Sequence, residues 1–247
     1  MYKFNQIFKR DFLNLALNPA WILYVTLFPY LLVLILGFLG SGSYTGSVTS
    51  YDYYGIAMMI YIIFNTSTIA ANSFMEERIK NGNMRLIYSP IPKSYIYVSK
   101  IAATFVFTGI CHVLVLLLLK LTLNVNLGGK NIGFVILILI VFELFSSILG
   151  VLLCCIFRSE NTTNQILSII VNIFSILGGL FFRVDGLGKN IEKISSISPV
   201  KWIITDIFKI IYSNDFSGYV QTILIISVIS VLAVILCGKF YRTEDYV

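Results

Sequence analysis

The alternation of apolar and polar positions predicts an amphipathic helix at the start of the chain. Over residues 2–18 the apolar side chains recur at spacings of three and four, which places them on one face of a helix. The apolar positions are Phe4, Ile7, Phe8, Phe12 and Leu15, and the polar positions opposite them are Lys3, Asn5, Lys9, Arg10, Asp11 and Asn14. A helix of this kind lies in the headgroup layer of a membrane rather than across it. Asn18 and Pro19 end it.

Six apolar runs follow, each close to the ~20 residues that cross a hydrocarbon core about 30 Å thick. They cover residues 21–39, 53–74, 97–119, 132–157, 163–182 and 219–238. Residues 183–218 are too apolar for a free loop and too interrupted for a span, and therefore predict a re-entrant or interfacial hairpin on the outer side. The expected fold is all-α: an interfacial helix (1–18) and a six-span membrane domain (19–247) with a charged segment at 75–100.

The composition agrees with an integral membrane protein. Hydrophobic residues make up 57% of the chain and charged residues 12%, whereas soluble domains carry about 25% charged residues. The net charge of +6 comes from basic residues at the ends of the apolar runs, where they meet anionic lipid headgroups. No basic face interleaved with aromatic residues stands apart from these runs, so nucleic acid is not an expected partner.

The distribution of basic residues predicts that both termini lie in the cytoplasm. With six spans, eleven of the eighteen Lys and Arg residues fall on the side of the termini and seven on the other side. The first outer loop, residues 41–52, contains none of them. Cytoplasmic loops of membrane proteins carry this excess of positive charge.

The chain lacks the motifs of a self-contained enzyme. It has no GxxxxGK[ST], HExxH or GxSxG sequence, a single histidine (His112), and four cysteines inside apolar runs without a CxxC pair. We therefore expect no cofactor or metal on this chain.

Ion-coupled carriers place several ionisable residues at mid-membrane, whereas in this chain only Glu143 is clearly at that depth. A separate ATP-hydrolysing partner is the favoured hypothesis; the alternatives are a gradient-driven transporter or channel, and a membrane scaffold or sensor that transports nothing.

The segment 75–100 interrupts the apolar pattern with five basic residues and two prolines. The sequence 81–83, Asn-Gly-Asn, breaks a helix. A short helical turn over 84–88 is then ended by Ser89-Pro90. Arg85, Leu86 and Tyr88 are the residue types that anchor protein interfaces. The segment is predicted to contact a cytoplasmic partner; an ordinary loop held by headgroups is the alternative.

Several motifs, in order, resemble those of type-2 ABC exporter permeases. The family pattern after the second of six spans is Glu-Arg, Gly-Thr, Leu and then Ser/Thr-Pro-Ile/Val. The corresponding residues here, in the same order, are Glu77-Arg78, Gly82-Asn83, Leu86 and Ser89-Pro90-Ile91. The family's turn between spans four and five is similar to Phe157-Arg158-Ser159. The family's last block of motif residues is similar to Gly179-Leu180-Phe181-Phe182 together with Leu187 and Pro199. The chain departs from the pattern at Asn83, Arg85, Arg183 and Gly188, where the family has Thr, Glu, Pro and Pro.

The resemblance implies a subunit of a bacterial ABC exporter in the cytoplasmic membrane. Two permease subunits, identical or related, would pair and bind two P-loop ATPase subunits that hold the ATP and Mg²⁺. The substrate would be an amphipathic molecule (drug, antibiotic peptide or lipid) moved outward. The segment after the second span would form a coupling helix in a groove of the ATPase. The coupling residues are then Glu77, Arg78, Gly82, Asn83, Arg85, Leu86, Tyr88, Ser89 and Pro90.

Six further residues are candidates for the substrate pathway. They are Asn65, Thr66, Thr68, Glu143, Phe181 and Phe182. For the polar residues of the second span, hydrogen bonding between helices is the alternative. For Glu143 the alternative is a protonated packing contact with a Ser, Thr or Asn of a neighbouring span. For the aromatic pair it is a structured outer loop. His112 is predicted to be a packed, neutral side chain.

Overall fold

The computed structural model describes residues 2–42, 48–75, 91–182 and 189–241, and every regular element within them is helical. The long helices and the N-terminal helix are α1 (Tyr2–Ala16), α2 (Pro19–Leu39), α3 (Ser50–Met75), α5 (Ser94–Leu123), α6 (Ile132–Phe157), α7 (Glu160–Gly178) and α10 (Tyr219–Phe240). The shorter elements are η1 (Gly129–Asn131), α8 (Lys189–Ser195), α9 (Pro199–Phe208) and the π-helix η2 (Lys209–Ser213). The predicted all-α class is confirmed for these residues.

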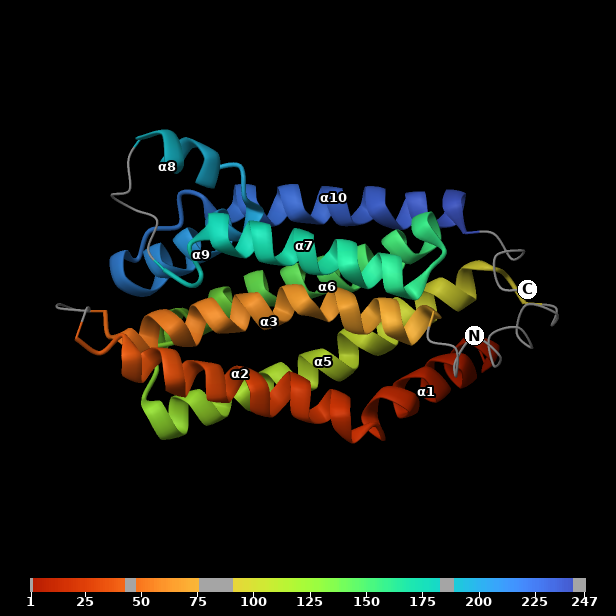
Figure 1. Ribbon diagram of the computed structural model, residues 1–247, viewed down its shortest axis with the longest axis horizontal. Helices are drawn as coiled ribbons and strands as arrows, with labels where there is room; N and C mark the ends of the chain where they lie inside the picture. Colours follow the sequence, from red (N-terminus) through yellow and green to blue (C-terminus); the bar gives the residue numbers. More distant parts are fainter. Residues whose placement is uncertain (1, 43–47, 76–90, 183–188, 242–247) are drawn as a thin grey trace.

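The long helices α2, α3, α5, α6, α7 and α10 run side by side along the longest axis of the molecule in alternating directions (Figure 1). Helix α1 lies at the end where α10 finishes, and α8 and α9 lie at the opposite end (Figure 1). Helix α3 is the centre of the bundle: most of its side chains are buried against α2, α5, α6 and α7. The main core therefore surrounds α3.

Five of the six predicted spans coincide with helical segments long and apolar enough to cross a membrane. These are Pro19–Leu39, Ser50–Met75, Ser94–Leu123, Gly129–Phe157 and Tyr219–Phe240. The remaining one, α7, has a similar length and packs in the same bundle, but its first turns carry a run of polar residues, which lowers its apolar character. Its helix also begins and ends earlier than the predicted 163–182.

Capping residues explain where α2 begins and where α7 begins and ends. The Asn18 side chain accepts a hydrogen bond from the Ala20 amide at 3.1 Å, and Pro19 occupies the first position of α2. Ser159 caps α7 through the Thr162 amide. Gly179, with φ of +79°, closes α7 in the left-handed conformation that glycine adopts without strain.

The closest helix contact is between α3 and α6. A Cβ atom added at Gly150 would lie 2.0 Å from the backbone oxygen of Ser67, so only glycine fits there without a shift of the backbone. One turn further along α6, the Cys154 thiol points at the Ala71 carbonyl at 3.6 Å. Small residues thus allow the two helices to approach closely, as is usual for membrane helices.

The end of the bundle that carries α8 and α9 is held together by side-chain hydrogen bonds. Asp52, at the start of α3, accepts a hydrogen bond from the Asn126 amide of the α5–α6 loop at 2.6 Å. The Thr222 hydroxyl of α10 donates to Asp206 of α9 at 2.7 Å. Helix α9 buries Val200, Ile203, Ile204 and Ile207 in the main core. Within the predicted hairpin 183–218, residues 189–213 are therefore mostly helical and α9 is packed into the bundle.

Candidate functional site

Helix α3 reaches the surface along a single polar stripe. The partly exposed positions of this otherwise buried helix are Tyr51, Tyr54, Tyr61, Thr68 and Asn72. At about 3.6 residues per turn, the last four fall within an arc of about 40°. All four carry a hydroxyl or amide group. The exposed stripe of α3 therefore consists of polar side chains. The rest of the helix is buried in the bundle.

Helix α7 carries a matching stripe. Asn161, Gln165, Ser168 and Asn172 are all exposed and, by the same helical geometry, lie within an arc of about 60°. The opposite side of α7 buries Leu167 into the bundle. These polar positions are the reason that α7 is less apolar than the other long helices.

Hydrogen bonds join the two stripes into one surface. The Asn164 amide of α7 donates to the Asn72 side-chain oxygen at 2.6 Å, and the Tyr61 hydroxyl donates to Asn172 at 3.3 Å. We call the surface formed by Tyr54, Tyr61, Thr68 and Asn72 of α3 and Gln165, Ser168 and Asn172 of α7 the α3–α7 polar face. Polar groups are unfavourable against lipid acyl chains and normally face protein or water.

The structure separates the predicted pathway residues of α3. Asn65 lies beside the polar face, and its amide donates to the Tyr61 carbonyl at 2.9 Å. Thr68 belongs to the face itself. Thr66 is fully buried on the other side of the helix, where its hydroxyl bonds the Ile63 carbonyl at 2.7 Å. Among the described residues, the alternative of hydrogen bonds to other helices is not realised by Asn65 or Thr66, because both bond within α3.

The predicted aromatic pair lies where α7 ends. The Phe181 ring packs edge-on against Tyr61 with centroids 5.1 Å apart, and its carbonyl accepts a hydrogen bond from the Tyr54 hydroxyl at 3.3 Å. Phe182 is exposed. Phe181 therefore adjoins the α3–α7 polar face at the end of the bundle that carries α8 and α9. Sequence reasoning missed Tyr54, Tyr61, Gln165, Ser168 and Asn172, although the last three recur at spacings of three and four.

Glu143 lies elsewhere, in contact with His112. Its Oε1 is 2.8 Å from His112 Nδ1, and both side chains are buried between α5 and α6. The Glu143 side chain thus contacts His112 rather than the Ser, Thr or Asn of the alternative interpretation, and His112 is buried, as predicted, with Glu143 as its partner. The two residues are 31 positions apart, so neither helix alone reveals that they meet.

A second buried pair fixes α1 to the beginning of α5. The Lys100 Nζ lies 2.7 Å from Asp11 Oδ1, and the Ser99 hydroxyl donates to Asp11 Oδ2 at 2.6 Å. Asp11 and Lys100 are only 2% and 1% exposed. The amphipathic α1 is confirmed as a helix, but the placement of Asp11 on its polar, solvated side is wrong because α5 covers that position.

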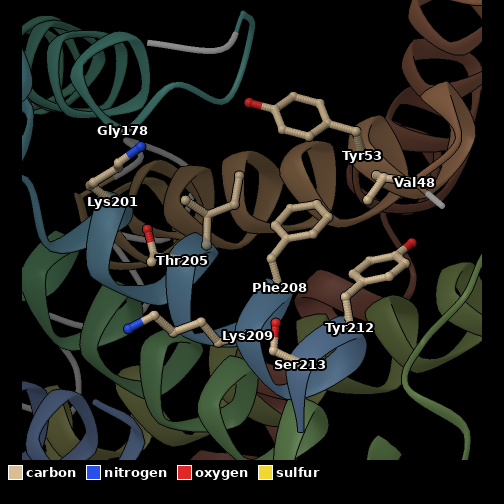
Figure 2. Close-up of a pocket in the computed structure, with 10 residues that line it drawn as sticks. Val48, Tyr53, Gly178, Lys201, Thr205, Phe208, Lys209, Tyr212 and Ser213 are labelled. Atoms are coloured by element: carbon tan, nitrogen blue, oxygen red, sulfur yellow. The ribbon is translucent and has the colours of Figure 1, made fainter. Parts of the chain in front are cut away.

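A cavity of about 320 Å³ lies at the opposite end of the bundle. Figure 2 shows Lys201, Thr205, Phe208, Lys209 and Tyr212, from α9 and η2, on one side of it, with Tyr53 and Val48 near the start of α3 on the other. Burial and the nearby Asp52 carboxylate raise the pKa of the Tyr212 phenol, which therefore stays protonated at neutral pH. Aromatic walls with two lysines suit an amphipathic molecule that carries negative charge.

The nine predicted coupling residues between Glu77 and Pro90 lie outside the described residues, which resume at residue 91. Their assignment stays a prediction. The chain returns at Ile91, directly before α5, so the segment connects α3 to the helix that carries Lys100.

An all-helical bundle with several membrane-crossing helices and a hydrogen-bonding face on its central helix defines a polytopic membrane protein. The sequence matches the ABC-2 type transporter family over residues 2–212, and the chain belongs to that family. It is therefore the membrane component, or permease, of an ABC transporter, and the family implies association with an ATPase subunit. No curated protein matches the sequence.

Proposed function

We propose that this chain is the permease subunit of an ATP-driven exporter that moves an amphipathic molecule outward across a bacterial cytoplasmic membrane. The observation that carries the proposal is the α3–α7 polar face. Within the described residues, α3 is partly exposed only at Tyr51 and at the four members of this face, Tyr54, Tyr61, Thr68 and Asn72. Such a surface is costly in lipid and is suited to a second permease subunit, identical or related, with the substrate pathway between the two copies.

The chemistry of this face suits an amphipathic substrate. Phenol rings offer apolar area together with a hydroxyl, while Gln165, Ser168 and Asn172 offer neutral hydrogen-bonding groups. The aromatic, lysine-lined cavity lies beyond Phe181 at the end of the bundle that we assign to the outside. A drug, an antibiotic peptide or a lipid could thus be bound by neutral groups along α3 and α7 and released at the outer end.

The topology of the proposal has six spans, with α7 as the fifth. The polar residues of α7 are tolerated in a span because they face the partner permease or the pathway rather than lipid. The α8–α9 segment then forms the outer re-entrant hairpin, and both termini lie in the cytoplasm. The coupling segment, 75–100, docks on a P-loop ATPase through its residues from Glu77 to Pro90, and each complex has two ATPase subunits that bind ATP and Mg²⁺.

The test is reconstitution with a candidate P-loop ATPase, which is to be sought first among the neighbouring reading frames. Inside-out vesicles are assayed for ATP-dependent uptake of an amphipathic fluorescent dye and of a fluorescent phospholipid analogue. We expect Arg85→Ala and Leu86→Ala to reduce both ATPase co-purification and uptake, because they remove the interface anchors. Lys120→Ala, at the other end of α5, serves as the control and should leave both unchanged.

Three results would each contradict the proposal in whole or in part. Uptake without any ATPase, abolished by Glu143→Gln, would establish the gradient-driven transporter or channel. Unchanged co-purification and uptake in both Arg85→Ala and Leu86→Ala would remove the coupling assignment. A complex that hydrolyses ATP but moves neither probe in any direction would favour the scaffold or sensor.

A further inference from the structure

A pocket of about 220 Å³ lies between α5 and α6, away from the α3–α7 polar face. Its walls are apolar side chains from the two helices, and of the residues that line it only His112 and Glu143 are polar. Ile110, Val113 and Ile140 are 53%, 48% and 41% exposed, so the pocket opens on the outer surface of the bundle. The pocket is an apolar recess with one polar pair in its wall.

The position of the pocket separates it from the proposed pathway. It touches α3 at Ile63, two residues from Tyr61 of the polar face, and thus about 200° around the helix from it. Glu143 lies near the middle of the apolar helix α6. The mouth of the pocket therefore faces the acyl-chain region of the bilayer, and a ligand would enter it from the membrane.

The charge state of the Glu143–His112 pair limits which ligand fits. An unpaired charge at mid-membrane costs about 2.5–3.5 kcal/mol on insertion scales, which favours the electrically neutral forms of the pair. There are three such forms: the carboxylate with the imidazolium, the acid protonated on Oε1 with the ring proton on Nε2, and the acid protonated on Oε2 with the ring proton on Nδ1. The first two differ by one proton transfer along the 2.8 Å contact between Oε1 and Nδ1.

Each neutral form presents one hydrogen-bond donor and one acceptor to a ligand. In the first two, Glu143 Oε2 accepts and His112 Nε2 donates, and in the third Oε2 donates and Nε2 accepts. The buried Nε2 has no hydrogen-bond partner within the described part of the chain. A buried polar atom of this kind is costly to leave without a partner. The pair therefore offers one acceptor and one donor, and a hydroxyl group complements both.

Gly109 leaves the carboxyl group open to the pocket. A Cβ atom at this position would lie 3.8 Å from Glu143 Oε2, and Gly109 itself lines the pocket. A larger side chain at position 109 would occupy the space next to Oε2. The glycine thus keeps a path for a ligand group to reach the acid.

We propose that this pocket binds a neutral, lipophilic alcohol from the membrane, with its hydroxyl donating to Glu143 Oε2 and its hydrocarbon body between α5 and α6. A protonated amine fits less well because it would bring a net positive charge to mid-membrane unless the pair first lost a proton. A phospholipid fits less well because its charged headgroup would have to leave the interface. The pocket is a lipid-side site separate from the transport pathway.

The test uses the full chain in lipid nanodiscs without an ATPase, so its result does not depend on transport. The probe is a long-chain primary alcohol with a diazirine near its hydroxyl end, compared with its methyl ether and the corresponding primary amine. Labelled peptides are identified by mass spectrometry. We expect the alcohol to label α5 and α6 around residues 105–116 and 136–143 roughly tenfold more than the ether, since the ether lacks one hydrogen-bond donor.

Two glycine variants separate pocket binding from general adsorption. Gly109→Val fills the pocket beside Glu143 and should reduce labelling by the alcohol several-fold. Gly133→Val is the matched control, because a Cβ at Gly133 meets nothing within 4 Å, and it should label like the unmodified chain. Size-exclusion profiles establish that each variant is folded. Gly109→Ala, which fits at van der Waals distance, tests the site if Gly109→Val is not folded.

The proposal predicts both a chemical preference and a location. Equal labelling by alcohol and ether would overturn it in favour of a groove for acyl chains. Stronger labelling by the amine would overturn it in favour of a cation site. Labelling that Gly109→Val and Gly109→Ala leave unchanged, or that falls outside α5 and α6, would also overturn it.

Discussion

Asp11 shows how one residue changes meaning between the sequence and the fold. It stands among Lys9, Arg10 and Asn14 on the polar side of an amphipathic helix, yet it is buried against Lys100 and Ser99. Burying two charges costs desolvation energy, which close contact and a further hydrogen bond offset. The pair ties the interfacial helix to the first turns of α5, next to the proposed coupling segment.

We therefore predict that Asp11→Asn destabilises the protein by about 3–5 kcal/mol, because it leaves the Lys100 ammonium buried without its counter-charge. The measurement is chemical unfolding in detergent micelles, together with limited proteolysis of α1. Combining Asp11→Asn with Lys100→Met should recover much of the loss, since the unpaired charge is gone. Lys9→Gln, on an exposed position, is the control. Equal stability of Asp11→Asn and Lys9→Gln would contradict the prediction.

Gly150 is the second position where one residue decides the packing. Gly150→Ala places a methyl group 2.0 Å from the Ser67 oxygen, so α3 and α6 must separate. Overpacking of this kind costs about 1–3 kcal/mol, and we expect a lower thermal unfolding midpoint. Gly133→Ala in the same helix has open space and should be neutral or slightly stabilising. If both substitutions have the same effect, the close approach at Gly150 is not important for stability.

At the scale of elements, α7 differs from its neighbours because of where it lies. Its apolar side buries Leu167 and Val171, while Gln165, Ser168 and Asn172 remain exposed. Helix α10 exposes Val228, Leu232 and Ile235 over its middle, whereas α7 exposes Ile169 and Ile173 beside its polar stripe. The polar stripe is thus the feature that distinguishes α7 from α10.

This difference predicts the reactivity of two engineered cysteines at equal depth. Ser168 lies eight positions after the start of α7, and Leu232 lies eight positions before the end of α10, at the same end of the bundle. We expect Ser168→Cys to react with a water-soluble maleimide, or to cross-link to a second permease subunit, and Leu232→Cys to do neither. The native cysteines are all buried and give a low background. An unreactive Ser168→Cys would contradict a pathway or a subunit interface on α7.

At the scale of the whole molecule, the alternation of six long helices places α1 and the end of α10 at the same end of the bundle (Figure 1). If α7 crosses the membrane, the α5–α6 loop and the α8–α9 segment lie on the same side. In the structure they lie at the same end of the bundle, where the Asn131 side chain donates to Asn214 at 2.7 Å, as a crossing α7 requires. Finding Ser196 and Lys130 on the same side of the membrane would therefore support six spans.

We predict that an impermeant maleimide labels Lys130→Cys and Ser196→Cys in intact cells, whereas Asn5→Cys reacts only after permeabilisation. All three positions have exposed side chains, so access depends on the side of the membrane. Labelling of Ser196→Cys only in permeabilised cells would mean that α7 does not span. Labelling of Asn5→Cys in intact cells would reverse the predicted orientation.

The sequence by itself determined the helical class, the amphipathic α1, five of the membrane-crossing helices to within a few residues, and the family. Apolar run length and helical periodicity are local properties, and the motifs are contiguous, so no tertiary information is needed to recognise them. The sixth span was also predicted, but the polar residues of α7 leave its apolar character below that of the other five.

Only the tertiary structure decided which side chains meet. The pairs Asp11–Lys100, His112–Glu143 and Asn72–Asn164 join residues from 31 to 92 positions apart. Helical periodicity gives the direction of a side chain around its own axis but not the neighbour on that side. That neighbour depends on how close the helices approach, as at Gly150, and on their rotation. The packing around α3 therefore placed Thr68 on the polar face, Thr66 in the core, and Glu143 beside a histidine in the wall of a pocket between α5 and α6.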